Sequence, residues 1–259
     1  MLPELERYYD AAPRSAARVE QVGPFSVFVG TGSWSYYARP RLGLEHAFTI
    51  ADVEAATARK RELGQPENIE WVHETTPTLL DAVRAAGLEV LEAPLLVLDR
   101  SAWRAPEPPS GMTLRVLDAD DPALAAASAV QAVGFGAPGT APGPEGVRER
   151  DAAIDDADSA FLRERMRRGL TVTVVAESEY GPVAAGAHQP VDGVSEIVGV
   201  ATLPAVRRQG LGGAVTGALV EDALARGVET VFISAGSDDI ARVYARLGFR
   251  RVGTACIVG

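Results

Sequence analysis

The most informative part of this sequence is a single stretch. Residues 198–215 read Val198-Gly199-Val200-Ala201-Thr202-Leu203-Pro204-Ala205-Val206-Arg207-Arg208-Gln209-Gly210-Leu211-Gly212-Gly213-Ala214-Val215. A β-branched run ends at a proline, a turn rich in Arg, Gln and Gly follows, and a helical pattern begins after the glycines. The free N–H groups and the dipole of a helix N-terminus favour negative charge, and glycines let an anion approach the backbone closely. This order therefore predicts an anion-binding site, for which a pyrophosphate is the natural ligand.

Three kinds of pyrophosphate site share this order, and the spacing of their residues separates them. A Walker loop needs a Lys after its last glycine, but the only Lys in the chain is Lys60, far upstream. A Rossmann turn needs a third glycine where this chain has Val215. The remaining pattern is Arg207-x-x-Gly210-x-Gly212. For so short a pattern, an ordinary glycine-rich connection between a strand and a helix is the alternative.

A second motif follows downstream. Residues 229–235 combine β-branched and aromatic side chains and predict a buried strand. The next residues read Asp238-Asp239-Ile240-Ala241-Arg242-Val243-Tyr244-Ala245-Arg246-Leu247-Gly248-Phe249. We expect Asp238 to cap a helix there and Gly248 to end it.

The two motifs resemble the signatures [RQ]-x-x-G-x-[GA] and N-x-x-A-x-x-[LV]-Y-x-x-[LM]-G-F of the GCN5-related N-acetyltransferase (GNAT) superfamily. The resemblance covers about residues 111–259. Asp238 departs from the pattern, because Asn is usual at this position. A helix cap survives that exchange, whereas an amide contact to the coenzyme does not. The resemblance implies an α/β fold with a mixed sheet and acetyl-CoA as the acyl donor.

The same resemblance assigns residues to the coenzyme. Backbone N–H groups near residues 200–202 are expected to polarise the thioester, in a strand that separates from its neighbour so that pantetheine pairs in the gap like an extra strand. Arg208 and Gln209 add side-chain donors, and Arg suits phosphate contacts. The residues expected to bind the coenzyme are Val200, Ala201, Thr202, Arg207, Arg208, Gln209, Gly210, Leu211, Gly212, Gly213 and Asp238.

Acetyl transfer to an amine also needs a group that takes a proton and one that stabilises the departing thiolate. By resemblance, Tyr244 is the expected acid; a core Tyr with its hydroxyl at the surface is the alternative. Glu196 is the expected base, because the histone-acetyltransferase branch of the family places a Glu at a similar distance before its glycine turn. A partly apolar cleft would raise the pKa of Glu196. His188 and a water are the alternative bases.

A proline-rich stretch, residues 104–111, divides the chain and reads as a stiff linker. We therefore expect an N-terminal domain at 1–105, a linker at 106–111 and a catalytic GNAT domain at 112–259. Within the catalytic domain, the patterns predict strands at 112–117, 172–177, 183–189 and 196–203. They predict helices from 118 to about 135 and from about 145 to 168, with a loop around 134–144.

The N-terminal part carries a weak internal repeat. Residues 80–90 and 243–252 both read as helix, glycine, apolar residue and strand, which suggests a smaller, degenerate GNAT-like half. This half lacks the arginine–glycine turn, and Val83 stands where the second copy has Tyr244, so we expect it to bind no coenzyme. Chance similarity between two such units is the alternative.

Composition excludes several classes of function. The net charge of −10 argues against a nucleic-acid binder, since phosphate backbones need a basic face. A lone cysteine, Cys256, excludes an intrachain disulfide. The N-terminus lacks the apolar core of a secretory signal, and no apolar run approaches the ~20 residues of a membrane span. We therefore expect a cytoplasmic protein that does not bind membranes. His46 and His73 show no metal-ligand spacing, so we also expect that the protein needs no metal.

These observations predict an N-acetyltransferase that moves an acetyl group from acetyl-CoA to a primary amine of a small molecule, by direct attack in a ternary complex. The alternative from another class is a non-catalytic acyl-CoA-binding sensor or partner protein. The sequence leaves the acceptor, the acyl-chain length and the formation of a homodimer open.

Overall fold

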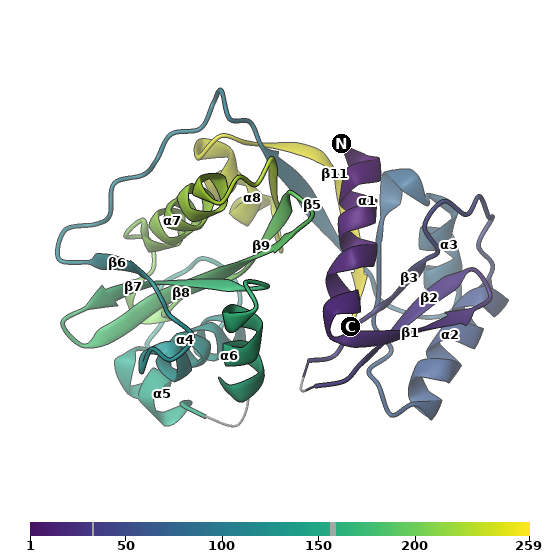
Figure 1. Cartoon of the computed structure of the whole chain (residues 1–259), viewed down its shortest axis with the longest axis horizontal. Coiled ribbons are helices and arrows are strands. Elements are labelled where there is room, and N and C mark those ends of the chain that lie inside the picture. The colour runs from purple at the N-terminus through teal and green to yellow at the C-terminus, as the bar shows by residue number, and fades with distance from the viewer. Residues whose placement is uncertain (33, 156–158) are drawn as a thin grey trace. The chain divides into compact units, whose positions relative to one another are not determined.

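The computed structural model describes residues 1–32, 34–155 and 159–259, as helices and strands joined by loops (Figure 1). The α-helices are α1 Leu2–Ala11, α2 Ile50–Glu62, α3 Thr78–Ala85, α4 Leu124–Gly136, α5 Val147–Ala152, α6 Ser159–Arg167, α7 Leu211–Ala225 and α8 Asp238–Arg246. The strands are β1 Ala17–Val22, β2 Phe25–Gly30, β3 Ala38–Pro40, β4 Ile69–Val72, β5 Leu91–Leu98, β6 Thr113–Val116, β7 Val172–Ser178, β8 Gly181–Val191, β9 Val194–Thr202, β10 Thr230–Ser234 and β11 Phe249–Val258.

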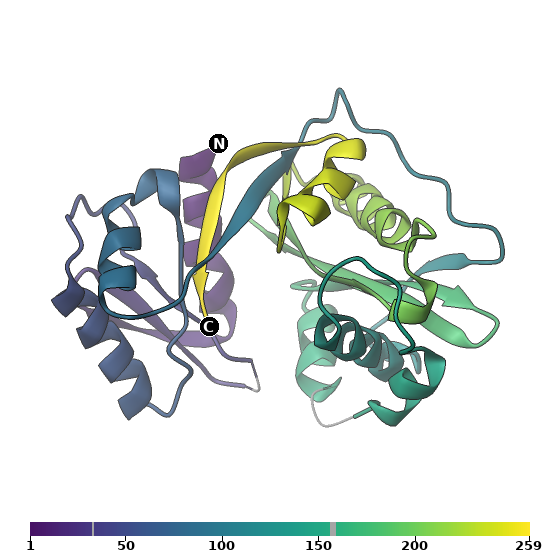
Figure 2. The ribbon, with the colours of Figure 1, turned by 180° about the vertical axis from the view of Figure 1, so that it is seen from behind.

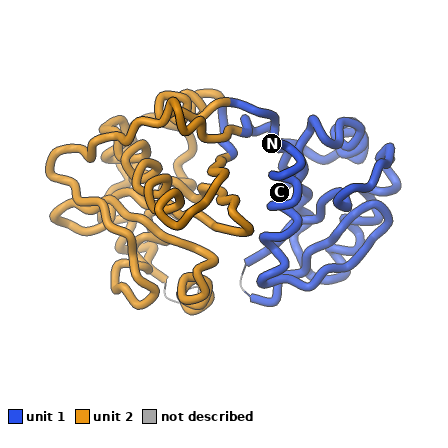
Figure 3. Tube along the Cα trace, turned by 45° about the horizontal axis from the view of Figure 1, so that its top comes forward, with its two compact units in different colours: residues 1–95, 234–237, 251–259 blue, residues 96–233, 238–250 orange. Residues whose placement is uncertain are grey.

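The chain folds into two compact units (Figure 3). Unit 1 comprises residues 1–95, 234–237 and 251–259, and unit 2 comprises residues 96–233 and 238–250. The sequence predicts a division into an N-terminal domain at 1–105, a linker at 106–111 and a catalytic domain at 112–259, and this division stays a prediction. The compact units divide the chain elsewhere, because 96–111 belong to unit 2 and 251–259 to unit 1.

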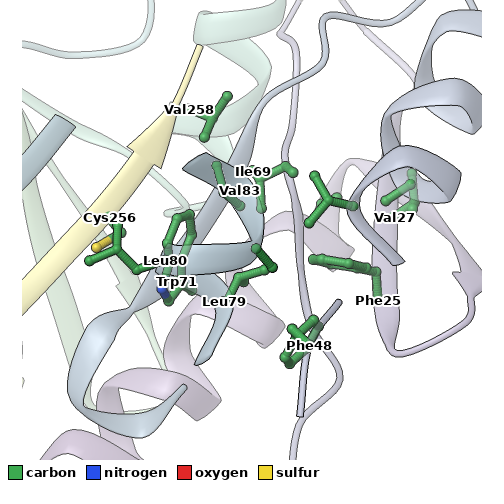
Figure 4. Packing of buried hydrophobic residues seen from close by; sticks show 14 of the residues in the cluster. Phe25, Val27, Phe48, Ile69, Trp71, Leu79, Leu80, Val83, Cys256 and Val258 are labelled. Carbon is green, nitrogen blue, oxygen red and sulfur yellow. The ribbon is translucent and has the colours of Figure 1, made fainter. Parts of the chain in front are cut away.

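Unit 1 is built on the strand order β1-β2-β3-β4-β11, and its last strand comes from the C-terminal end of the chain (Figure 2). Strand β11 runs antiparallel to β4, with Val258 opposite Ile69 and Ala255 opposite Val72. Cys256 and Val258 thereby join a buried apolar cluster with Trp71 and with side chains of α2 and α3 (Figure 4). Residues from both ends of the sequence therefore form one core.

Unit 2 is built on the strand order β10-β9-β8-β7-β6. Strands β6 to β9 are antiparallel neighbours, whereas β9 and β10 are parallel. Helices α4 and α7 cover opposite faces of this sheet (Figures 1 and 2). Close approaches confirm the two faces: a Cβ at Gly186 would touch Val215 and Leu219 of α7, and a Cβ at Gly134 of α4 would touch Ala201.

Most expected elements of unit 2 are found within a few residues of their predicted bounds, but two helices differ. The helix expected from residue 118 begins only at Leu124, because the Asp121 carboxylate accepts a hydrogen bond from the Ala123 N–H (2.8 Å) and holds a turn there. The prediction of one helix over 145–168 is wrong, because α5 ends at Ala152. Residues 153–155 are not helical, 156–158 lie outside the described residues, and α6 follows.

The proline-rich stretch packs against unit 2. Residues 104–109 form neither helix nor strand, as its prolines predict. The Pro106 ring lies so close to α7 that a Cβ at Gly217 would come within 2.6 Å of it. Glycine at this position of α7 therefore allows the stretch to lie along the helix.

The C-terminal strand should determine the stability of unit 1. Because Val258 is 6% exposed, Val258→Asp would bury a carboxylate among apolar side chains, which costs about 3 kcal/mol or more of folding free energy. We expect Val258→Asp to melt at a lower temperature than the wild type, with unfolding monitored by the fluorescence of the buried Trp71. The control Gly259→Asp, at an exposed neighbouring residue, should melt like the wild type. Equal melting of the two variants would contradict the assignment of β11 to this core.

Candidate active site

The turn at residues 207–213, between β9 and α7, has alternating backbone conformations like those of anion-binding nests, and we call it the nest. Arg208 has a φ of +66° and Gly210 a φ of +86°, and α7 starts at Leu211. Positive φ is costly for a residue with a side chain, so its occurrence at Arg208 marks a strained turn of the kind found at functional sites. In a nest, alternating backbone conformations turn successive N–H groups towards one side, and the first-turn N–H groups of a helix have no partner within the helix.

Gly212 is not required by packing within the described residues. The atom nearest to a Cβ at this position would be Thr202 Oγ1 at 3.8 Å, an ordinary van der Waals contact. Arg208 and Gln209 are exposed beside this turn. Their side chains can therefore reach an anion bound at the helix start.

The sequence suggests that the Arg207 side chain contacts a phosphate, but in the structure it contacts the protein backbone. Its guanidinium donates hydrogen bonds to backbone carbonyls: Gly134 O at 2.8 Å, Ala137 O at 2.7 Å, Ala141 O at 3.2 Å and Thr202 O at 3.3 Å. The side chain thus joins the C-terminal end of α4 and the following loop to the end of β9. An Arg207 contact to pyrophosphate would require these bonds to be exchanged.

Strand β9 leaves its parallel neighbour before it reaches the turn. Its register with β10 runs from Val194–Thr230 to Ile197–Ile233, and no later pairing of the two strands is found in the described part of the chain. The expected coenzyme residues Val200, Ala201 and Thr202 lie in the portion beyond Ile197. That portion can offer backbone N–H and C=O groups to a ligand on the β10 side.

The same portion of β9 contains a bulge against β8. Ala185 pairs with Ala201 but Ala187 pairs with Val198, so Gly199 and Val200 together lie opposite one residue of β8. Gly199 has a φ of +64°. A bulge inserts a residue and exchanges the faces of the side chains after it. Accordingly, Val200 lies on the α7 face near Gly186, and Ala201 lies on the α4 face against Gly134.

Glu196 lies on the α4 face of the sheet. Its neighbour Ser195 is on the α7 face, because Ser195 and Asp222 of α7 both hydrogen-bond His188. Side chains alternate along a strand, so Glu196 points to the opposite face. It is partly buried and lies opposite Gln189 of β8.

His188, the alternative base, lies on the other face and is completely buried. Its Nδ1 is 2.9 Å from Ser195 Oγ and its Nε2 is 2.9 Å from Asp222 Oδ2. Burial lowers the pKa of His188 despite the Asp222 carboxylate, which is also paired with Arg226. With both ring nitrogens bonded and no exposed surface, His188 joins α7 to the sheet and does not reach a substrate.

Tyr244 lies on α8, and this helix approaches the nest. A Cβ at Gly213 of α7 would lie 3.9 Å from Leu247, just after α8. Tyr244 is 7% exposed and packs edge-on against Phe249. Burial raises the pKa of its phenol, so the hydroxyl keeps its proton at neutral pH. Asp238 is the first residue of α8, where the helix dipole favours a carboxylate.

Sequence reasoning missed Gln131. The Gln131 Nε2 of α4 donates a hydrogen bond of 2.8 Å to the carbonyl of Gly199, at the bulge. A signal was present, because Gln131 and Ser128 are the only polar residues in a helix that otherwise consists of Ala, Val, Leu, Phe and Gly. The pairing partner of that amide, however, cannot be inferred from local sequence.

The comparisons with known proteins agree on one fold. Residues 142–249 match the acetyltransferase (GNAT) family. A GCN5-related N-acetyltransferase from Kribbella flavida is 23% identical, with a TM-score of 0.71, and covers 100% of this chain and 95% of its own. A GCN5-related N-acetyltransferase-like protein from Streptococcus suis is 12% identical, with a TM-score of 0.59 and coverages of 99% and 97%.

A tandem GNAT protein from the clavulanic acid biosynthesis pathway is 16% identical, with a TM-score of 0.58, and covers 92% of this chain and 78% of its own. No curated protein matches the sequence. The mixed α/β fold of the GNAT type, expected from the two motifs, is confirmed.

Two features are absent from the described residues. None of the helices in residues 1–32, 34–155 and 159–259 combines the length and the apolar character of a membrane span. Over the same ranges, no group of three or more His, Cys, Asp or Glu side chains is arranged to hold a metal ion.

The buried His188 predicts a loss of stability in acid. Its folded-state pKa is lowered, so below about pH 6.5, the ordinary value, the unfolded chain binds a proton that the folded chain resists. Stability should fall as the pH drops from about 6.5 towards the lower, folded-state pKa. In His188→Gln this fall should be shallower, as measured by urea unfolding from pH 7 to 5. Ser195→Ala, which keeps the imidazole, should retain the wild-type slope; an unchanged slope in His188→Gln would contradict this.

Proposed function

We propose that the protein, whose residues 142–249 match the acetyltransferase (GNAT) family, transfers an acetyl group from acetyl-CoA to a primary amine of a small molecule. One observation carries the proposal: β9 leaves β10 after Ile197 and then leads directly into the nest at 207–213. An open strand edge suits the amides of pantetheine, and a nest suits a pyrophosphate. Acetyl-CoA carries both groups in this order.

The residues proposed to hold the coenzyme follow from this arrangement. The pyrophosphate would accept hydrogen bonds from the backbone N–H groups of residues 208–213, with the exposed Arg208 and Gln209 beside it. Arg207 would act indirectly by fixing the end of β9 through its bond to Thr202 O. The N–H groups of residues 200–202 would face the thioester.

In the proposed reaction the amine attacks the thioester carbon directly. The N–C bond forms and the C–S bond breaks, so that the products are an amide and coenzyme A with a free thiol. Glu196 accepts the proton that the amine loses, directly or through a water. Tyr244 donates a hydrogen bond or a proton to the departing sulfur and is reprotonated from solvent. Donors aimed at the carbonyl oxygen stabilise the charge that develops there.

We propose that the loop after α4 contributes to the choice of acceptor. Besides the Arg207 bonds, Gly143 N donates to Pro204 O (3.1 Å) and Ala205 N donates to Glu145 O (2.9 Å). The loop is therefore fixed to the segment that connects β9 to the nest. The net charge of −10 favours a cationic amine over an anionic acceptor. The N-terminal half lacks the arginine–glycine turn and is proposed to bind no coenzyme.

The direct test is the release of coenzyme A thiol from acetyl-CoA in the presence of a panel of small amines. Amine-dependent release supports the enzyme. Binding of acetyl-CoA by calorimetry with no release for any amine would favour the acyl-CoA-binding sensor instead. Failure of the protein to bind acetyl-CoA would refute both.

Gly212 should separate coenzyme binding from folding. Gly212→Val places two methyl groups at the start of α7, where the proposed pyrophosphate lies, while the protein leaves ordinary space for the Cβ itself. We expect the Kd for coenzyme A to rise at least about tenfold, which corresponds to a loss of about 1.4 kcal/mol of binding free energy. Melting should change little, because Val and Gly are both weak helix formers.

The matched control is Gly212→Ala, which adds only the Cβ and should bind coenzyme A nearly as well as the wild type. Calorimetry and thermal melting of the three proteins give both quantities. Unchanged affinity in Gly212→Val would place the pyrophosphate elsewhere.

The two proposed proton-transfer residues should differ in their pH dependence. Glu196→Gln should lose about 10²-fold in kcat/KM at neutral pH and regain part of it at higher pH, where the acceptor amine is already deprotonated. Tyr244→Phe should lower kcat without such recovery, because the raised pKa of Tyr244 keeps its proton in place in the wild type. Neither should weaken coenzyme A binding. Wild-type kcat in Tyr244→Phe would refute the assigned acid.

A further inference from the structure

The hydrogen bond between Gln131 and Gly199 lies at the point where β9 changes faces. The bulge of Gly199 and Val200 opposite one residue of β8 interrupts the ladder there, so the β8 strand does not fix the peptide between them as it fixes its neighbours. A side chain from α4 makes the contact instead, through the Nε2 of Gln131 at 2.8 Å from Gly199 O.

The position beneath this amide favours glycine. A Cβ at Gly199 would lie 2.4 Å from Gln131 Nε2, so the end of the Gln131 side chain would have to shift, and the φ of +64° disfavours other residues. Gln131 therefore covers the backbone of Gly199 directly.

The direction of one group in a peptide fixes the other. A trans peptide is planar, and its C=O and N–H groups point in opposite directions. Because Gln131 holds the Gly199 carbonyl towards α4, it also sets the direction of the Val200 N–H. A hydrogen bond accepted by the carbonyl polarises the peptide and strengthens the donor on its other side.

We infer that Gln131 is a positioning residue, which aims and strengthens the Val200 N–H as a donor to the carbonyl oxygen of the acyl thioester. The inference rests on the proposed function, since it takes the ligand at this strand to be acetyl-CoA. Gln131 itself touches only the protein backbone. Its effect on the reaction would pass entirely through the peptide between Gly199 and Val200.

The test uses the full-length protein and acetyl-CoA labelled with 13C at the thioester carbonyl. Isotope-edited infrared difference spectra report how strongly the bound carbonyl is polarised, and they need no acceptor amine. Gln131→Met keeps the length of the side chain without the N–H donor, and Gln131→Glu keeps the shape but offers no donor when ionised. Ser128→Ala is the matched control, because its hydroxyl bonds only Leu124 O within α4.

In the wild type and Ser128→Ala, binding should shift the carbonyl stretch to lower frequency. In both Gln131 variants this shift should be largely lost, while the Kd for coenzyme A without the acyl group stays within about twofold. Removal of an oxyanion donor lowers kcat about 10²- to 10³-fold, so a donor that is present but misdirected should cost about 10- to 100-fold in kcat with any active amine.

Three results overturn the inference. The first is no carbonyl shift in the wild type, and the second is an unchanged shift in both Gln131 variants. The third is a loss of affinity for coenzyme A in the Gln131 variants as marked as their loss of the carbonyl shift, which would make Gln131 a purely structural residue. Each of these leaves the proposed function standing, because that function is judged by amine-dependent thiol release from the wild type. Absence of acetyl-CoA binding to the wild type would instead refute the proposed function, and the inference with it.

Discussion

Strand β9 cannot pair regularly with both of its neighbours, β8 and β10, along its whole length. Up to Ile197 it pairs with β8 on one side and with β10 on the other, as a strand inside a sheet must. Beyond that residue the β10 pairing ends, and the inserted residue at Gly199 changes the register with β8. Buried backbone groups must find other partners where a ladder stops. The end of the β10 pairing leaves backbone groups of β9 beyond Ile197 without that strand as a partner. At the bulge against β8, Gln131 bonds the carbonyl of Gly199.

The local patterns of the sequence were sufficient for elements whose residues contact their own neighbours. The strand predicted to end at Leu203 ends at Thr202, and the helix begins at Leu211 directly after the turn; both follow from a β-branched run, glycines and helix formers in succession. The breakdown of the predicted helix at 145–168 shows the limit. There Glu149 accepts a hydrogen bond from the N–H of Gly146 and caps the start of α5, and Arg150 donates to the distant carbonyl of Pro182. The contact of Arg150 cannot be inferred from local sequence.

The candidate site shows the same division. Except for Asp238, the residues proposed to bind the coenzyme lie in one contiguous strand, turn and helix, so their proximity could be predicted from the sequence alone. The environment of a long side chain could not. Arg207 is a residue type that suits phosphate, yet its side chain bonds three carbonyls of the distant segment 134–141 as well as that of nearby Thr202. His188 likewise is a residue type that can act as a base. Only the tertiary structure reveals that Ser195 and Asp222 form hydrogen bonds with its two ring nitrogens.

The chain order of the two units carries a consequence for folding. The motif that ends at Phe249 continues without interruption into β11, whose last residues pair with β4 and enter the core around Trp71. Unit 1 thus lacks a strand until the end of the chain is available, and contacts between such distant residues form slowly because a long loop must close first. A cut in the proline-rich stretch would follow the boundary visible in the sequence, but it would remove from unit 1 the strand that carries Cys256 and Val258. The arginine–glycine motif can therefore be assigned to unit 2 alone, whereas the stability of unit 1 depends on residues that come after that motif.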